Sequence, residues 1–338
     1  MLGVYISGHK QAECRETPPP VAGPGLVLVR IQASAICGSD LHRYRAVDPS
    51  QRYGDVVAGH EPCGVVEDVG AGVLTVRPGD RVVIYHMFGC GRCVHCRVGD
   101  FRQCPRKGSY GRMRPGGDAE FMVVPEINCL PLPDSLSYVA GAVLACNGGT
   151  AYNAVARANV RGGDTLLVSG AGPVGLCCIL FGVACGAKVI AVDVSAARLQ
   201  LARALGATEV VDAASGTPAP RVVEWTGGAG VTAAIETSGA GPAHQALLDS
   251  LAVGGRGVFV GFGARGPTVN LTQIIGRGQT LIGSQIFDIV DFPSILDAVR
   301  RGGIDLERVV THRFPLQAAA EAFRVADEAS AGKVVFVV

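Results

Sequence analysis

The amino-acid sequence predicts an α/β protein with two domains, one built on a doubly wound parallel sheet and one made mostly of β-strands. Three observations lead to this fold class. The chain has 338 residues, which is more than one ordinary hydrophobic core needs. From residue 165 onward, apolar strands alternate with glycine turns and helical segments, the pattern of a doubly wound sheet. Before residue 146, short apolar runs are separated by turn residues, as in an antiparallel β domain.

The two ends of the chain are expected to share the mostly β domain. Its early strands are expected at 25–36, 55–70, 80–87 and 119–125. After residue 287 come an amphipathic stretch, a second helical segment and the closing apolar run KVVFVV. We therefore place the β domain at 1–146, the parallel-sheet domain at 147–286, and a return to the β domain at 287–338.

Charge and composition favour a small molecule as the partner. The formal net charge is +1, which offers no global attraction for nucleic acid or for an acidic membrane surface. The apolar run at 166–192 is interrupted by glycines and a proline, so strand, turn and helix explain it better than a membrane span. The first ten residues lack the charged and apolar segments of a signal peptide, so we expect a cytoplasmic protein.

A glycine-rich turn indicates a dinucleotide site in the second domain. Gly170, Gly172 and Gly175 form a GxGxxG motif that follows a buried strand and opens a helical segment, and Asp193 ends the next strand. The helix N-terminus would meet the phosphates, and the carboxylate would bind the adenosine ribose, which favours NAD over NADP. Arg198, one turn into the following helix, either lies near the ribose or is solvated. The predicted cofactor-binding set includes two more motif residues, Pro173 and Val174.

The glycine turn by itself leaves two alternatives open. A strand-to-helix turn can be rich in glycine without binding a ligand. Methyltransferases bind adenosylmethionine at a similar glycine loop, with an acidic residue at the end of the second strand. Only metal-binding residues elsewhere in the chain separate a dehydrogenase from such an enzyme.

Four cysteines in a short segment predict a structural metal site. The spacing CxxCxxCx7C places four thiolates on one glycine-containing loop, at 89–106. Four soft ligands that fill every position describe a closed tetrahedral zinc site. An iron–sulfur cluster is the alternative, because CxxCxxC with a later Cys-Pro also occurs in ferredoxins, although the long last gap fits them poorly. The predicted ligands are Cys90, Cys93, Cys96 and Cys104.

Two further cysteines and a histidine predict a second metal site, of the open kind. Cys37 lies in ICGSDLH, His60 in AGHEPCG and Cys146 in LACNGGTAY. Each is weak evidence alone, since a lone cysteine is usually a buried apolar residue. Together, three protein ligands leave zinc a fourth position for substrate. We interpret the six remaining cysteines as buried apolar residues: Cys14, Cys63, Cys129, Cys177, Cys178 and Cys185.

The order and spacing of these motifs resemble the zinc-containing medium-chain dehydrogenase/reductase family, which includes alcohol and polyol dehydrogenases. The resemblance covers the whole chain and includes CGSDxH, GHExxG, the four-cysteine segment and GAGPVG. It implies a Rossmann domain that binds NAD and a discontinuous GroES-like catalytic domain. It also implies two zinc ions per subunit, one catalytic and one structural, and assembly as a homodimer or homotetramer.

The resemblance also implies roles for single residues around the catalytic metal. Cys37, His60 and Cys146 match the ligands of the catalytic zinc, and Glu61 matches a carboxylate beside the metal. Asp40 matches the residue that fixes the ring of the ligand histidine. Polyol and threonine dehydrogenases often have a carboxylate in place of Cys146, so this chain follows the alcohol dehydrogenases at the third ligand.

The family's proton path and pocket can be matched in the same way. Ser39 matches the hydroxyl residue that touches the substrate oxygen, and His42 matches the outer histidine that exchanges the proton with solvent. Thr150 matches a residue against the nicotinamide ring. His86 falls where alcohol dehydrogenases have an apolar pocket wall, which suggests a hydroxylated substrate, although a loop residue without substrate contact is an equal alternative.

These features together predict a zinc-dependent oxidoreductase that transfers hydride between an alcohol and NAD. A secondary alcohol, on a polyol, sugar or cyclitol, is the preferred substrate, and the matching ketone would use the same residues. A noncatalytic binding protein of the same fold is the alternative to an enzyme. Such a protein would be expected to lack a zinc ligand or a proton-path residue, whereas here the full set is present.

Overall fold

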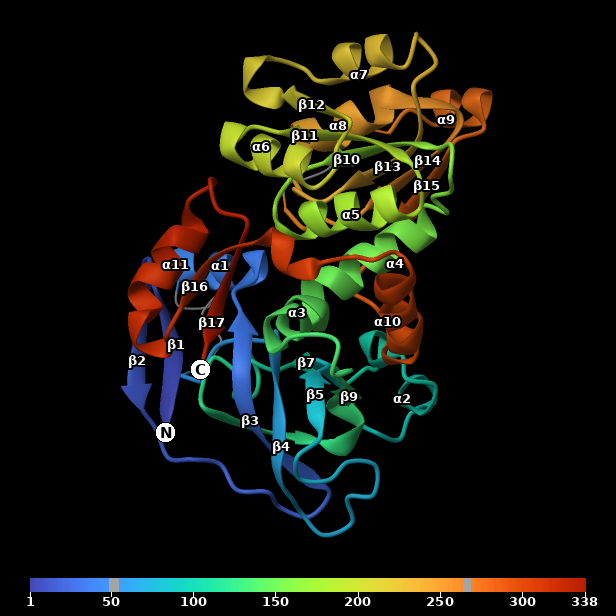
Figure 1. Ribbon diagram of the computed structural model, residues 1–338. Coiled ribbons are helices and arrows are strands. Elements are labelled where there is room, and N and C mark those ends of the chain that lie inside the picture. The colour runs from blue at the N-terminus through green and yellow to red at the C-terminus, as the bar shows by residue number, and fades with distance from the viewer. Residues whose placement is uncertain (49–54, 264–268) are drawn as a thin grey trace.

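Two β-sheets, one parallel and one mostly antiparallel, organise the computed structural model (Figure 1). The structure describes residues 1–48, 55–263 and 269–338. In Figure 1 the parallel sheet with its helices forms the upper body and the second sheet forms the lower one. Helices α3 (Tyr138–Val143) and α4 (Gly149–Arg157) lie between them. The chain therefore crosses from one body to the other just before the glycine-rich turn.

The parallel sheet has six strands in the order β12-β11-β10-β13-β14-β15. Every neighbouring pair runs parallel. The strand order reverses between β10 and β13, and ligands of doubly wound sheets bind beyond the carboxyl ends at such a switch point. The strands are β10 (Thr165–Ser169), β11 (Lys188–Asp193), β12 (Glu209–Asp212), β13 (Val231–Glu236), β14 (Leu251–Phe259) and β15 (Thr280–Gly283).

Helices cover this sheet, and α5 is the most deeply buried of them because apolar residues surround it on nearly every side. Its first turn approaches the sheet closely: a Cβ added at Gly175 would lie 1.8 Å from the carbonyl oxygen of Gly170. Only glycine allows this contact between helix and strand turn. The helices are α5 (Pro173–Ala184), α6 (Ala196–Ala204), α7 (Ala219–Trp225), α8 (Gly241–Ser250) and α9 (Leu271–Arg277).

The second sheet joins early strands to the last two strands of the chain. Its order is β16-β17-β3-β4-β5-β9, and β8 pairs with β3. Strand β17 runs antiparallel to β3, whereas β16 and β17 are parallel to each other, a pairing for which the sequence made no prediction. The strands are β3 (Leu26–Ala35), β4 (Pro62–Val69), β5 (Arg81–Ile84), β8 (Phe121–Pro125), β9 (Cys129–Pro131), β16 (Val310–Phe314) and β17 (Lys333–Val337).

Smaller elements surround this sheet and carry much of the candidate chemistry. A π-helical turn, Leu144–Gly148, joins α3 to α4, and sequence reasoning missed this whole helical stretch because its alanines and glycines show no apolar period. The remaining strands are β1 (Leu2–Gly8), β2 (Gln11–Glu16), β6 (Met87–Phe88) and β7 (Gly108–Ser109). The remaining helices are α1 (Gly38–Arg45), α2 (Val94–Arg97), α10 (Phe292–Arg301) and α11 (Ala319–Asp327).

One core cluster links the two bodies. It runs from Ala33 of β3 through Val143 of α3 to Leu166 of β10 and Ile179 of α5. Because the apolar contact is continuous, the two sheets hold the residues between them in fixed positions. Among the helices in the described ranges, none combines the length and apolar character that crossing a membrane requires.

Candidate metal centres and dinucleotide site

Four buried side chains meet where the second sheet, near β3 and β4, approaches the π-helical turn. The ligand atoms of Cys37, His60, Glu61 and Cys146 all lie within 4.8 Å of one another. Cys37 precedes α1, His60 and Glu61 precede β4, and Cys146 lies in the π-helical turn. Segments far apart in the sequence thus place two sulfurs, one imidazole and one carboxylate around a single point.

The imidazole of His60 is held by a buried carboxylate. Asp40 Oδ1 lies 3.1 Å from His60 Nδ1, and Asp40 Oδ2 accepts a hydrogen bond from the Cys37 N–H at 3.0 Å. With Nδ1 committed as a donor, Nε2 keeps its lone pair for a metal. Ser39 Oγ lies 3.5 Å from His60 Nε2, so a hydroxyl also faces this side of the ring.

A lysine that sequence reasoning missed completes the cluster. Lys333, the first residue of β17, is fully buried, and its Nζ lies 2.5 Å from Glu61 Oε2 and donates to the Ile36 carbonyl at 2.7 Å. A lysine at the start of an otherwise apolar strand was the available signal. Its ammonium group pairs with Oε2 of Glu61, whose other oxygen, Oε1, lies 4.0 Å from His60 Nε2.

The charges in this cluster call for a cation. A hydrogen bond from Cys146 is the largest effect that lowers the pKa of the Cys37 thiol, and burial raises the pKa of Glu61 to about 8 although Lys333 opposes the rise. Burial lowers the pKa of His60, but Asp40 and Cys37 raise it by more. The hydrogen bond with Cys37 raises the pKa of the Cys146 thiol. If both sulfurs were thiolates they would repel each other and Glu61, and a divalent ion that prefers sulfur and nitrogen ligands would remove that repulsion.

Three more polar side chains lie in or beside the π-helical turn. Asn147, which sequence reasoning missed, points its Nδ2 toward Cys37 Sγ at 3.8 Å. His86 is buried, its Nδ1 lies 3.2 Å from the Ala145 carbonyl, and its ring centre is 5.1 Å from that of His60. Burial lowers the pKa of His86 to about 3, so it is neutral. Thr150 is also buried, and its Oγ1 has no hydrogen-bond partner within the described ranges.

The predicted proton-path residues lie on one helix. Ser39 and His42 are both in α1, where they are three positions apart and so share one face. Ser39 is half-buried, whereas His42 is exposed. The pair therefore runs from the metal cluster to the protein surface.

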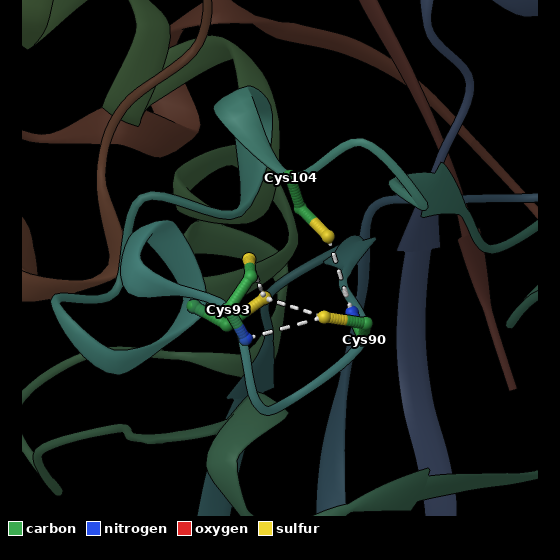
Figure 2. A group of neighbouring side chains, drawn as sticks. Cys90, Cys93 and Cys104 are labelled. Carbon is green, nitrogen blue, oxygen red and sulfur yellow. Dashed lines mark hydrogen bonds between the residues drawn. The ribbon is translucent and has the colours of Figure 1, made fainter.

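The four-cysteine segment folds around its own sulfurs (Figure 2). The ligand atoms of all four cysteines lie within 4.8 Å of one another. Cys90 Sγ accepts the Cys93 N–H at 3.4 Å, and Cys104 Sγ accepts the N–H groups of Cys90 and Arg106 at 3.3 and 3.4 Å. Backbone N–H groups of Arg92 and Cys93 lower the pKa of the Cys90 thiol to about 5. Although burial opposes it, backbone N–H groups likewise lower the pKa of Cys104, whereas burial raises the pKa of Cys96 to about 12, so the segment favours the thiolate at Cys90 and Cys104.

The glycine-rich turn has the geometry expected of a dinucleotide site. Gly170 has φ +91°, a conformation that other residues avoid, and Gly172 caps α5, with Pro173 and Val174 in its first turn. Asp193 ends β11, where its carboxylate accepts the N–H groups of Ala171 at 2.7 Å and Ser195 at 2.9 Å. These bonds fix the carboxylate beside the helix N-terminus.

Arg198 is not fully solvated, which was one of the two interpretations that the sequence allowed. It is half-buried, its Nε donates to the Ala331 carbonyl at 2.9 Å, and its Nη1 would lie 4.0 Å from a Cβ added at Gly172. The guanidinium therefore sits beside the phosphate end of the turn and ties it to the segment before β17.

Sequence reasoning missed a buried glutamate at the carboxyl end of β13. Glu236 accepts the N–H groups of Ser238 at 2.7 Å and Gly239 at 3.1 Å. Next to it, Thr237 Oγ1 donates to the Gly170 carbonyl at 2.8 Å. The signal was an acidic residue that ends an apolar strand, and its effect is to hold this loop against the glycine turn.

Comparison with known protein families agrees with this geometry in both bodies. Residues 173–301 match the family described as zinc-binding dehydrogenase, and residues 23–134 match the alcohol dehydrogenase GroES-like domain. This chain belongs to the zinc-containing medium-chain dehydrogenases. The predicted fold class, a Rossmann-type parallel sheet with a GroES-like domain, is confirmed.

Relatives of the dehydrogenase match it over nearly its whole length. L-threonine 3-dehydrogenase of Sinorhizobium medicae is 33% identical over 323 residues, which span 94% of this chain and 93% of the relative. The structure of alcohol dehydrogenase TADH from Thermus sp. ATN1 superposes with a TM-score of 0.91 at 31% identity and covers 100% of both chains. A short chain alcohol dehydrogenase (rspB) from Escherichia coli CFT073, solved with the cofactor NADH, has a TM-score of 0.89 and 28% identity, and covers 100% of this chain and 99% of that one.

Family membership decides between the alternatives that the sequence left open. The dehydrogenase is an oxidoreductase rather than a methyltransferase, and its two donor sets fit zinc rather than an iron–sulfur cluster. Four thiolates suit a closed tetrahedral ion, and the mixed set of two sulfurs and one nitrogen, beside a carboxylate that is paired with Lys333, suits an open one. Among the six other cysteines, the prediction was wrong for Cys185, which is exposed, and Cys14 is only half-buried.

Asp118 supports the segment of the dehydrogenase that carries His60. It is fully buried, its Oδ1 accepts the Ser34 hydroxyl at 2.6 Å, and its N–H donates to the Ala58 carbonyl at 2.9 Å. A Cβ at Gly59 would lie 2.1 Å from the same Oδ1, so only glycine fits there. Burial raises the pKa of Asp118 to about 7, and the nearby charge of Asp40 adds to the rise.

Asp118→Asn tests this buried carboxyl. Its pKa is higher in the folded than in the unfolded chain, so its stabilising effect is complete below the unfolded value and is lost as pH rises toward 7. Relative to the always neutral amide variant, the native protein should lose on the order of 3 kcal/mol of unfolding free energy between pH 4 and pH 8. Urea denaturation at several pH values measures this, with the exposed Asp134→Asn as control. A difference between native and variant that does not change with pH would contradict the assignment.

Proposed function

We propose that this dehydrogenase oxidises a secondary alcohol with NAD, or reduces the matching ketone with NADH, at a zinc ion held between its two sheets. The observation that carries the proposal is the buried set of Cys37, His60 and Cys146, beside which Glu61 is paired with Lys333. Three ligands that converge with one position open are what substrate binding at zinc requires.

Each residue of this set has a separate task in the proposed reaction. Cys37, His60 and Cys146 hold the metal, Asp40 fixes the His60 ring through Nδ1, and Glu61 remains nearby as an alternate donor. Zinc in this position supplies Lewis acidity toward the carbinol oxygen of the substrate. The thiols bind as thiolates, and burial among apolar residues excludes water from the reacting atoms.

The proton of the alcohol leaves along α1 in this proposal. Ser39 Oγ, half-buried beside His60, accepts a hydrogen bond from the substrate hydroxyl and passes the proton outward. His42, exposed on the same helix face, exchanges it with solvent. A group that links a buried hydroxyl to bulk water is needed because the metal cluster itself is sealed from solvent.

NAD occupies the carboxyl edge of the parallel sheet in this proposal. The pyrophosphate lies against the N-terminus of α5, where Gly172 admits close approach and Arg198 supplies positive charge. The adenosine ribose bonds to Asp193, and the nicotinamide lies near the buried Thr150, whose Oγ1 lacks a protein partner. The NADH-bound relative with this fold supports the same cofactor here.

The substrate class follows from the polar wall of the pocket. His86 is buried and neutral, with its ring against that of His60, so it offers a hydrogen bond to a second polar group of the substrate. Threonine, the substrate named for the relative from Sinorhizobium medicae, is itself a secondary alcohol with polar neighbours. We infer a hydroxylated secondary alcohol, such as a polyol, sugar or cyclitol, rather than a simple primary alcohol.

A substrate screen tests the proposed function. Alcohols, polyols and sugars are assayed for NADH formation, while zinc is counted per chain by atomic emission. We expect two zinc ions and turnover of at least one secondary alcohol. His60→Ala should retain one zinc ion and bind NADH, but lose turnover by a factor of at least about 10³, because a metal ligand is gone. Turnover by that variant, or no activity with any alcohol, would refute the proposal.

Asp193→Ser tests the ribose contact. The carboxylate repels a 2′-phosphate, so its replacement by a small neutral residue should narrow the preference for NAD over NADP. We expect the ratio of kcat/KM values for the two cofactors to change by about 10-fold or more, a difference of about 1.4 kcal/mol. Asp212→Ser, at the end of the neighbouring β12, is the control. An unchanged ratio would exclude Asp193 from the ribose site.

We further propose that the chain divides at residues 146 and 286 and assembles as a homodimer or homotetramer. The pairing of β17 with β3 supports the return of residues 287–338 to the first body. Among the strands in the described ranges, β15 pairs only with β14, and exposed apolar side chains lie in the residues that connect β14 to β15. Ile275 is 81% exposed, Phe262 73% and Leu271 68%, which a second copy would cover.

Sedimentation measurements test this assembly. We expect the native protein to sediment as a dimer or tetramer, and Ile275→Glu to shift the equilibrium toward the monomer because it buries a charge in the contact. Leu74→Glu, at an exposed apolar residue in the other body, should leave the assembly intact. A monomeric native protein, or equal behaviour of both variants, would contradict the proposed surface.

A cytoplasmic location is the last part of the proposal. All twelve cysteines lie in the described ranges and none of them forms a disulfide. The four cysteines of the loop at 89–106, and Cys37 with Cys146, must be reduced to bind metal. A reducing compartment fits both facts.

A further inference from the structure

The segment that leaves the parallel sheet is held by side chains from several distant elements. After β15, the carbonyl oxygens of residues 283, 285, 286 and 287 each accept a hydrogen bond from a side chain. The donors are Arg157 and Asn153 of α4, Tyr85 beyond β5, and Arg102 of the four-cysteine segment. We call this run, residues 283–288, the crossing segment.

The crossing segment contains a strained residue. Ile286 has φ +39°, in the left-handed region that a β-branched side chain avoids. Asn153 Nδ2 donates to its carbonyl at 2.5 Å, and Tyr85 Oη donates to the next carbonyl, of Phe287, at 2.8 Å. Such a conformation persists only where the surroundings impose it, so these contacts determine the path of the segment.

Arg102 is the contact that comes from the metal-binding loop. It lies in a short 3-10 helix, Phe101–Gln103, directly before the ligand Cys104. Its Nη1 donates to the Gln285 carbonyl at 2.7 Å, its Nη2 lies 2.5 Å from Asp288 Oδ2, and the side chain is 12% exposed. This guanidinium is mostly buried and bonds two groups of the crossing segment. It therefore supplies positive charge to the segment and fixes the orientation of the segment.

Two neighbouring contacts make this a surface rather than a single bond. A Cβ at Gly99 would lie 2.7 Å from Ile289 and 2.9 Å from Val290, so the loop packs directly against the residues that follow the crossing segment. The ring of Phe101 lies 6.1 Å from that of Tyr85, which bonds the segment from the other side.

The crossing segment in turn touches the wall of the catalytic cluster. The ring of Phe287 fills the space beside Gly149, where a Cβ would lie 2.2 Å from it. Gly149 follows the π-helical turn that carries Cys146 and precedes Thr150. On the other side, Tyr85 is followed by His86, whose ring meets that of His60. A path of direct contacts therefore runs from the four-cysteine loop to the residues around the open metal site.

We propose that the four-cysteine loop, through Arg102, positions the crossing segment and thereby the wall of the active site. The zinc ion of this loop then serves the active site at a distance, because it fixes the 3-10 helix from which Arg102 reaches. Arg102 is a positioning residue, and its loss frees the strained segment without removing any catalytic group. The catalytic consequence rests on the proposed function, whereas the positioning itself does not.

Amide hydrogen exchange of the zinc-loaded protein, without substrate, tests the positioning. Arg102→Gln should keep both zinc ions and a melting temperature within a few degrees, while the amides of 284–291 exchange at least about 10-fold faster. The exchange rates of Arg102→Lys should fall between those of the native protein and of Arg102→Gln, because lysine keeps the positive charge but lacks the guanidinium fork. Arg97→Gln, at an exposed arginine of the same loop, should exchange like the native protein.

The opposing outcomes are distinct. Unchanged exchange at 284–291 in Arg102→Gln, an equal increase throughout the molecule, or loss of the loop zinc would each overturn the proposal. Activity gives a second measurement once a substrate is known: kcat should fall about 10-fold or more with zinc retained, whereas unchanged kcat and KM would refute the effect on the active site. If no alcohol is turned over, the hydrogen-exchange result still tests the positioning by Arg102. A failure of the proposed function can therefore be distinguished from a failure of this proposal.

Discussion

The burial of like charges between two sheets is the constraint on which the rest of this structure depends. Two sulfurs and a carboxylate share one sealed place with an imidazole, and no apolar packing could stabilise them as ions. Lys333 neutralises the carboxylate, and a divalent cation neutralises the sulfurs. Since Asp40 also holds the imidazole, a small set of ionic contacts decides where β3, β4, β17 and the π-helical turn must meet.

Local sequence patterns were enough to predict the groups that we propose bind metal and cofactor, because those groups lie in short motifs. The four-cysteine spacing, the glycine turn and Asp193 each carry their chemistry within a few positions. The alternation of strands and helices was enough for the fold class, but it gave no pairing for β16 and β17, whose parallel arrangement depends on a long connection. The roles of Ser39, His42 and His86 remain predictions, since the structure gives their positions but not their contacts with a substrate.

The residues that escaped prediction act through partners remote in sequence. Lys333 and Ile36 are 297 positions apart, and Asp118 reaches Ser34 across 84 positions. The local sequence around a lysine in an apolar strand, or around an aspartate after two glycines, does not predict its role. The partner of each residue comes close only when the sheet has formed. The same holds for Arg102, whose contacts with Gln285 and Asp288 join the two bodies.

The pairing of β17 with β3 has a consequence for the order of folding. Every strand of the parallel sheet is synthesised between these two partners, so the catalytic body cannot close until the cofactor body has been made. Until then Glu61 would lack its ammonium partner, and the half-built pocket would expose thiols and an unpaired edge of β3. Closure of the pocket by β17 and Lys333 is therefore a late event, although the predicted metal ligands all precede the parallel sheet in the chain.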